Sequence, residues 1–442
     1  MSEDVSARTA PSTSLRRARL REEVLESLWF IPLCCVIGAF VLSRVALDVD
    51  AALDVAPNTS GLTSDRAAYG AVAGVVAAAM LTFLGVVFST TLVAVQLAAS
   101  QYSPRIVRVF VRSRLTQATL GVFLATFVFA LASLFRVESS SNEFVPRATL
   151  ICLFSLVAAT VLMFVAYIHG MVRLLRVQYL LRITAASAHA TVDHAFPDAD
   201  AYHLATRPHV STDPQLVRNQ TTTTRRHRGT PRILQAVDVG GLAAAAAEHD
   251  CWVELCIGVG THAGPGLVVA QVHGPGRDRF HGNELLRHLL FGSERTLVQD
   301  PAFGLRQLVD TASRALSPAI NDPTTGVQAL HRVVDLLERV ANRPDPTGWY
   351  CDAVGSVRVH LVEASFEQLA RLGLTEILRY GADAPQVTRS LLAAYDELLQ
   401  VVSEDRRPLI DDLRTQCLEA IELAMPEPFK PLARLPDHEG LG

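Results

Sequence analysis

The sequence predicts a mainly α membrane protein, in which four transmembrane helices precede a C-terminal α+β domain. Half of the 442 residues are hydrophobic and the mean hydropathy is +0.26, which is more apolar than a typical soluble protein. The apolar residues concentrate in four runs, each long enough to cross a bilayer core of ~30 Å. These runs are about 28–47, 67–103, 117–135 and 148–172.

The remaining boundaries follow from changes in composition and from helix and strand periodicity. A strand is expected at 357–362, within the otherwise helical part of the domain. The predicted segments are an N-terminal tail (1–27), the transmembrane domain (28–173), a helix with a basic linker (174–231), a small mixed α/β module (232–275), a helical domain (276–425) and a Pro-rich tail (426–442).

The second apolar run is the stretch on which a functional prediction depends. It contains no charged residue, and as a helix it would be about 55 Å long. Four polar side chains recur at every seventh position, near one line on the helix surface. Lipid does not solvate such groups, so we expect the line to face protein or water. The four residues are Thr82, Ser89, Gln96 and Ser103.

Two interpretations of this polar line stay open. The side chains could line an aqueous path in a homo-oligomer, because neutral hydroxyl and amide groups can replace part of an ion's hydration. Alternatively, they could form hydrogen bonds within the helix bundle, which are common in membrane proteins. The third run has a similar line at Arg112, Thr119, Thr126 and Ser133.

Arginine is unevenly distributed around the four runs. It is abundant before the first run, after the second and after the fourth, and sparse in the other two connections. By the positive-inside rule, both termini are expected in the cytoplasm, with the protein in the plasma or inner membrane. Arg105, Arg108 and Arg112 follow Pro104 on one helix face. We expect them to contact anionic lipid headgroups, or to attract anions at the inner mouth of a pore.

Several chemistries are disfavoured by composition. Lys430 is the single lysine, so a Walker A loop or a pyridoxal Schiff base has no suitable lysine. The seven cysteines include no C-x-x-C pair, and His and Asp residues lack metal-ligand spacing. The net charge of −4 indicates no bulk attraction to nucleic acid. We therefore predict no cofactor, no metal and no catalytic residue, and we leave open whether the protein is an enzyme.

A candidate anion site lies in the block 300–325. Arg306, Arg314, Thr324 and Thr325 could hold a phosphate or carboxylate at the N-terminus of a helix that starts at Pro323. The structural alternative is that Asp322 caps this helix, while Asp310 pairs with the two arginines four positions away.

Three groups of residues resemble a bacterial family of predicted membrane proteins, domain of unknown function 2254. They are FSTTLVAVQLA with QYSPR (88–105), then GLRQLVD, RALSPA and NDPTT (304–325, with Gln299 and Asp300 before them), and RYGA (379–382). The resemblance covers nearly the whole chain and implies four spans with a cytosolic C-terminal domain. It implies no established activity.

Two functions are therefore considered. The first is a homo-oligomeric, channel-like or transport-related protein, whose cytosolic domain regulates or assembles it. The alternative is a membrane-anchored protein that binds a ligand or partner without transport.

Overall fold

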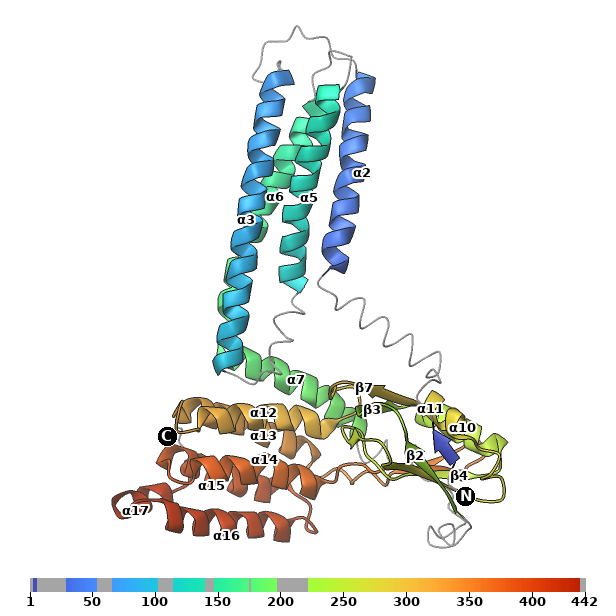
Figure 1. Ribbon diagram of the computed structural model, residues 1–442. Coiled ribbons are helices and arrows are strands. Elements are labelled where there is room, and N and C mark those ends of the chain that lie inside the picture. The colour runs from blue at the N-terminus through green and yellow to red at the C-terminus, as the bar shows by residue number, and fades with distance from the viewer. Residues whose placement is uncertain are drawn as a thin grey trace. The chain divides into compact units, whose positions relative to one another are not determined.

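The structure, a computed structural model, describes residues 3–5, 29–53, 66–101, 114–139, 147–174, 176–196 and 222–437. The chain divides into two compact units, one of residues 21–180 and the other of residues 1–20 and 181–442. The predicted fold class is confirmed. Four long apolar helices come first, and an α+β region with two small sheets and a set of helices follows (Figure 1).

The four membrane helices are α2 (Phe30–Leu53), α3 (Arg66–Gln101), α5 (Arg114–Ser139) and α6 (Arg147–Leu174). Each contains an apolar stretch long enough to span a bilayer. Helix α5 packs against the other three, and small residues at these contacts let the backbones approach closely. Buried examples are Ala73, Ala77, Ala125 and Ala130.

Helix α2 continues to Leu53, beyond the expected end at 47, and α5 is longer than the expected 117–135 at both ends. A polar residue in the added part of α2 is engaged. The Asp50 carboxylate is buried and accepts hydrogen bonds from the backbone amides of Ala148 and Thr149, at 2.6 and 2.9 Å. It also accepts one from the Thr149 hydroxyl, at 2.6 Å. Asp50 on α2 thus caps the N-terminus of α6, which joins the two helices at that end.

The α+β region contains one sheet of six strands and one of three. The larger has the order β1-β2-β6-β4-β9-β8, in which β1 with β2 and β4 with β9 are parallel and the other pairs antiparallel. The smaller is antiparallel with the order β5-β3-β7. The strands are β1 (Glu3–Val5), β2 (Thr222–His227), β3 (Arg232–Val237), β4 (Trp252–Leu255), β5 (His262–Ala263), β6 (Val268–His273), β7 (Leu289–Gly292), β8 (Trp349–Cys351) and β9 (Val357–His360).

These sheets extend the expected module 232–275 in both directions. Strand β2 belongs to the stretch expected as a basic linker, and β7 and β8 come from the stretch expected as helical, whereas β9 lies within the strand expected at 357–362. The difference has a physical cause, since a strand of four residues carries little periodicity of its own and is defined by its partner strand. Helices α10 (Val239–Glu248) and α11 (Gly282–Arg287) complete the core of this part.

The helices that follow pack as an antiparallel stack (Figure 1). They are α12 (Pro301–Ala315), α13 (Pro323–Val340), α14 (Phe366–Gly381), α15 (Pro385–Val401) and α16 (Arg407–Ala424). Asp300, Asp322 and Ser365 cap three of them through their side chains. Part of the expected Pro-rich tail is ordered as η2 (Glu427–Phe429) and α17 (Lys430–Ala433).

Helix α7 (Val177–Ala195) contributes its second half to the same region. Arg339 on α13 and Arg343, which follows α13, both bind the Asp193 carboxylate. The nitrogen to oxygen distances are 2.6 Å for Arg339 and 2.9 Å for Arg343. Gly304 of α12 lets Ala188 approach, because a Cβ at Gly304 would lie 2.5 Å from the Ala188 Cβ. These contacts hold the end of α7 beside the cavity described below.

Candidate functional site

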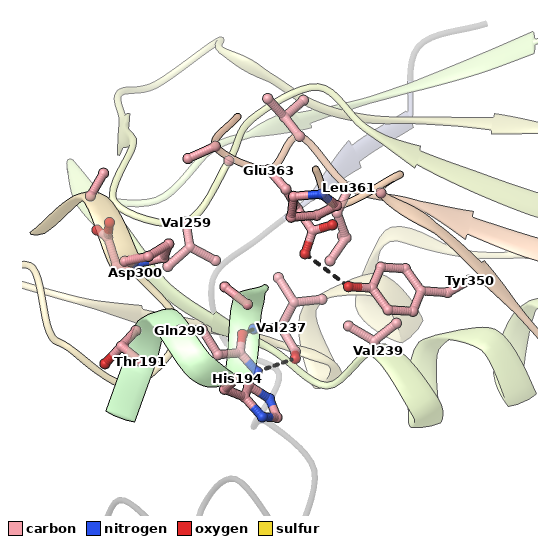
Figure 2. A pocket seen from close by; sticks show the side chains of 18 of the residues that line it. Thr191, His194, Val237, Val239, Val259, Gln299, Asp300, Tyr350, Leu361 and Glu363 are labelled. Atoms are coloured by element: carbon pink, nitrogen blue, oxygen red, sulfur yellow. Dashed lines mark hydrogen bonds between the residues drawn. The ribbon is translucent and has the colours of Figure 1, made fainter. Parts of the chain in front are cut away.

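A cavity of about 610 Å³ lies in the α+β region. Its wall combines the end of α7, the end of β3, the segment after β4, the loop before α12, and the segments that flank β8 and follow β9. Figure 2 shows the side chains converging on it from these segments. The apolar part of the lining includes Val237, Val239, Ile257, Val259 and Leu361.

Glu363 presents a carboxyl group to this cavity, two positions beyond the apolar Leu361. The Tyr350 hydroxyl donates a hydrogen bond of 2.8 Å to Glu363 Oε1 (Figure 2), and the Gly348 amide is a second donor. Burial raises the pKa of Glu363, although both donors and a protonated His194 favour the ionised form. Burial and the neighbouring Glu363 also raise the pKa of Tyr350, so its hydroxyl stays a donor.

Asp300 and Arg295 form a second polar pair at the cavity. Both guanidinium contacts, Arg295 Nε to Asp300 Oδ2 and Nη2 to Oδ1, are 2.9 Å long. Asp300 also accepts from the Phe303 amide and so caps α12. Its side chain is 3 % exposed, and this burial raises the pKa of Asp300 in spite of Arg295. Gly260 passes over the pair with φ +88°, in a space too small for a Cβ.

Two further polar residues fix the wall rather than leave groups free for a ligand. The Gln299 amide accepts from the Val237 N–H at 2.8 Å and donates to the Val237 carbonyl at 3.1 Å (Figure 2). In this way it continues the pairing of β3 past its end. The Thr191 hydroxyl on α7 donates to the Leu297 carbonyl at 2.7 Å. The cavity is therefore preformed, with its shape held by hydrogen bonds from loops and a helix end.

The residues of the expected anion site are placed as follows. Arg306 Nη1 lies 2.6 Å from Glu376 Oε2 and 3.8 Å from Asp310. Asp322 accepts from the Thr325 amide and hydroxyl, at 3.0 and 2.6 Å, and Thr324 is exposed. Arg314 lies in the last turn of α12 beside this helix start, whereas Arg306 is eight positions earlier, about 12 Å along the helix. The structural alternative describes Asp322 correctly, and anion binding there stays a prediction.

The polar line of the second run faces outward from the bundle. Thr82, Ser89 and Gln96 on α3 are all exposed. The Thr82 hydroxyl donates a hydrogen bond to the Ala78 carbonyl of the same helix. Between them, Gly85 has open space where a Cβ would be. Ser103, together with Arg105, Arg108 and Arg112, lies outside the described residues. Their roles as path-lining and lipid-contacting residues stay predictions.

The polar residues of the third run instead point inward and are used in packing. The Thr126 and Thr160 hydroxyls are 2.9 Å apart between α5 and α6, and the Tyr69 hydroxyl donates to Ser133 at 2.5 Å between α3 and α5. Thr119 is buried and bonds the Leu115 carbonyl. The two lines therefore do not face each other, and this one stabilises the bundle.

Sequence reasoning missed the cavity residues Glu363 and Tyr350, and it noted Gln299 only as part of the family resemblance. A partial signal existed, since Glu363 directly follows the strand expected at 357–362, where a carboxylate after an apolar run stands at a sheet end. Within the ranges that the structure describes, no three or more His, Cys, Asp or Glu side chains are grouped to hold a metal ion.

Comparisons with known proteins agree on the family and add no activity. The family model described as "Predicted membrane protein (DUF2254)" matches residues 25–397. Similar relatives are uncharacterized proteins of Mycobacterium bovis and Mycobacterium tuberculosis, 30% identical over 413 residues, which cover 90% of this chain and 75% of each relative. No solved structure matches the chain. The chain belongs to the DUF2254 family of predicted membrane proteins.

Proposed function

We propose that this protein is a membrane-anchored ligand-binding protein, with the cavity at Glu363 as its binding site. The observation that supports the proposal most is a preformed cavity of about 610 Å³, a volume typical of small-molecule sites. Much of its lining is apolar, and several of its polar groups are held in place by neighbours. An apolar wall with an oriented carboxyl group at Glu363 is suited to hold a drug-sized molecule and fix its direction.

A bulky substitution in the wall tests this function. Val259→Trp is expected to fill the cavity and to weaken binding of the neutral indole tryptophol at least about tenfold, because ligand and side chain need the same space. Val354→Trp is the control, since Val354 is 89% exposed and lies outside the cavity. Calorimetric titration of the full-length protein in detergent measures both. Binding that Val259→Trp leaves unchanged would contradict the proposal.

A second function, a homo-oligomeric and channel-like assembly, is favoured by the outward face of α3. Two heptad series on this face are exposed, and both contain mainly small or polar residues. In membranes such residues are typical of helix interfaces rather than of lipid-facing surfaces. Copies that meet along this face would bring the polar line to a shared axis. The series are Ala71, Ala78, Gly85, Leu92 and Val75, Thr82, Ser89, Gln96.

Cysteine crosslinking tests the assembly, and bilayer recording tests the path. Ser89→Cys is expected to crosslink copies on oxidation, whereas Leu162→Cys on α6, where Leu162 is 72% exposed, is expected to give only the wild-type background. If a path exists, Gln96→Leu should reduce current in planar bilayers by removing its amide. A crosslinked oligomer that passes no current would leave the assembly standing and exclude the channel.

The arginine pattern supports a cytoplasmic location for both termini and for the α+β region, with Arg105, Arg108 and Arg112 at anionic headgroups of the plasma or inner membrane. Cys256 is exposed on this region and reports its side of the membrane. A membrane-impermeant maleimide should label Cys256 in inverted vesicles and spare it in intact cells. Labelling of Cys256 in intact cells would indicate the opposite orientation and contradict the cytoplasmic location.

A further inference from the structure

We propose that the cavity selects a protonated organic amine joined to an apolar body, with the ammonium group bound by the Glu363 carboxylate. The inference rests on the proposed ligand-binding function and names the chemical class of its ligand. It differs from the anion site expected at Arg306, which belongs to another part of the helical stack.

The charged groups of the lining favour a cation over an anion. Arg295 is already paired, because two of its nitrogens meet the two Asp300 oxygens and its guanidinium lies 5.1 Å from the Phe303 ring centre. An anionic ligand would have to take Arg295 from a carboxylate that is 3 % exposed. Among the described contacts Glu363 has no arginine or lysine partner. Its two hydrogen-bond donors, Tyr350 and Gly348, are neutral, and His194 acts on it only through charge. The lining therefore favours a positive ligand.

The Glu363 carboxylate has acceptor sites left for a ligand. An ionised carboxylate offers about four lone-pair sites, of which Tyr350 and Gly348 use two. Both donors fix the carboxylate orientation toward the cavity (Figure 2). An ammonium group carries three donors and no acceptor, so it matches the sites that remain. Charge-assisted hydrogen bonds of this kind are the stronger ones.

A bare metal cation fits the cavity poorly. Hard cations require about six oxygen ligands, and among the described residues no three His, Cys, Asp or Glu side chains are grouped to hold one. The aliphatic part of the cavity wall is formed by Val237, Val239, Val259 and Leu361, among others. An aliphatic wall offers no ligands to a hydrated ion. It stabilises the apolar part of a bound molecule by removing that surface from water. A molecule with both an amine and a hydrocarbon or aromatic part satisfies the two halves of the cavity together.

Three indoles that differ in charge test the inference: tryptamine (cation), tryptophol (neutral) and indole-3-propionate (anion). The titration is run at about pH 8, where free tryptamine is a cation and free indole-3-propionate an anion. Calorimetric titration of the full-length protein is expected to rank tryptamine first, about tenfold tighter than tryptophol, with indole-3-propionate weakest. The same titrations of Val259→Trp, whose cavity is expected to be filled, measure how much of each indole partitions into the detergent micelle.

The variant Glu363→Gln assigns the preference to one residue. Glutamine keeps an acceptor for Tyr350 and loses the charge, so tryptamine should weaken to the level of tryptophol, while tryptophol is unchanged. Glu404→Gln is the control for overall charge, because the Glu404 side chain is 94% exposed and remote from the cavity. A tryptamine preference that survives Glu363→Gln would overturn the inference.

Acidification gives an independent readout. Since burial raises the pKa of Glu363, the carboxylate is protonated at a higher pH than an exposed glutamate, and the tryptamine affinity of the wild type should fall through that range. The groups that face the cavity with Glu363 are Tyr350, His194, Asp238 and the paired Arg295 and Asp300. His194→Ala removes any contribution of the imidazole: the fall in tryptamine affinity should persist in His194→Ala and be absent when His194→Ala is combined with Glu363→Gln.

The outcomes also separate this inference from the proposed function. If tryptophol binds, is blocked by Val259→Trp, and is matched or exceeded by indole-3-propionate, the amine preference is wrong and the ligand site stands. If none of the three indoles shows binding that Val259→Trp removes, both are contradicted.

Discussion

Asp300→Ala is expected to lower the free energy of unfolding of the α+β region by about 3 kcal/mol, because it breaks a buried ion pair and removes a helix cap. The Asp300 side chain is 3 % exposed and accepts from Arg295 and the Phe303 amide. The value is at the lower end for such pairs, since the Arg295 side chain keeps 28% exposure and can be partly solvated. Urea unfolding followed by the fluorescence of Trp252 and Trp349 measures it.

Asp322→Ala is the matched control for Asp300→Ala. Asp322 caps α13 as Asp300 caps α12, with a Pro in the first turn of both helices, but Asp322 accepts from Thr325 rather than from an arginine. Loss of the cap costs about 1 kcal/mol. Equal losses for the two variants would show that the Arg295 pair adds nothing to stability.

Gly260→Ala is expected to destabilise the same region by about 3 kcal/mol, through two separate effects. The backbone of Gly260 has φ +88°, which residues with a Cβ rarely adopt. A Cβ would also lie 2.3 Å from Asp300 Oδ2 and 2.8 Å from Arg295 Nε, so the ion pair would have to move. The same displacement should weaken tryptophol binding, because this pair forms part of the cavity wall.

Gly266→Ala separates the strain from the clash. Gly266 has nearly the same φ, +86°, and nothing lies within 4 Å of a Cβ built there. Gly266→Ala should lower the free energy of unfolding only by the cost of a left-handed backbone at a residue with a Cβ, roughly 1–2 kcal/mol. If Gly260→Ala were no worse than Gly266→Ala by the same urea measurement, the close approach at Asp300 would be relieved without cost.

Much of the fold is encoded locally, and for this reason the sequence predicts it. Each membrane helix is a continuous apolar run. The helices that begin at Pro301 and Pro323 can be recognised by the Asp-Pro pair at their N-termini. The ends of these helices were less predictable. The sequence pattern places Asp50 in a loop, and only the tertiary fold brings it to the α6 amides that it caps. The heptad spacing of Thr82, Ser89 and Gln96 is likewise local, but only packing against α5 shows that it faces outward.

The cavity could not be predicted because its parts are joined only by long-range pairing. Strand β4 pairs in parallel with β9, about a hundred residues later, and this brings the segment at Ile257 beside Glu363. Arg306 shows the same limit: the sequence offered Asp310 as its partner, whereas the nearer contact is Glu376 on α14. A polar side chain can be recognised in a sequence, but its partner depends on the tertiary fold.

A structure of the full-length protein solved with tryptamine tests the central claim most directly. The proposal predicts the indole ring against Val259 and Leu361, and the ammonium nitrogen within hydrogen-bonding distance of the Glu363 carboxylate. Tryptamine bound elsewhere on the protein, with no ligand in the cavity at saturating concentration, would contradict it.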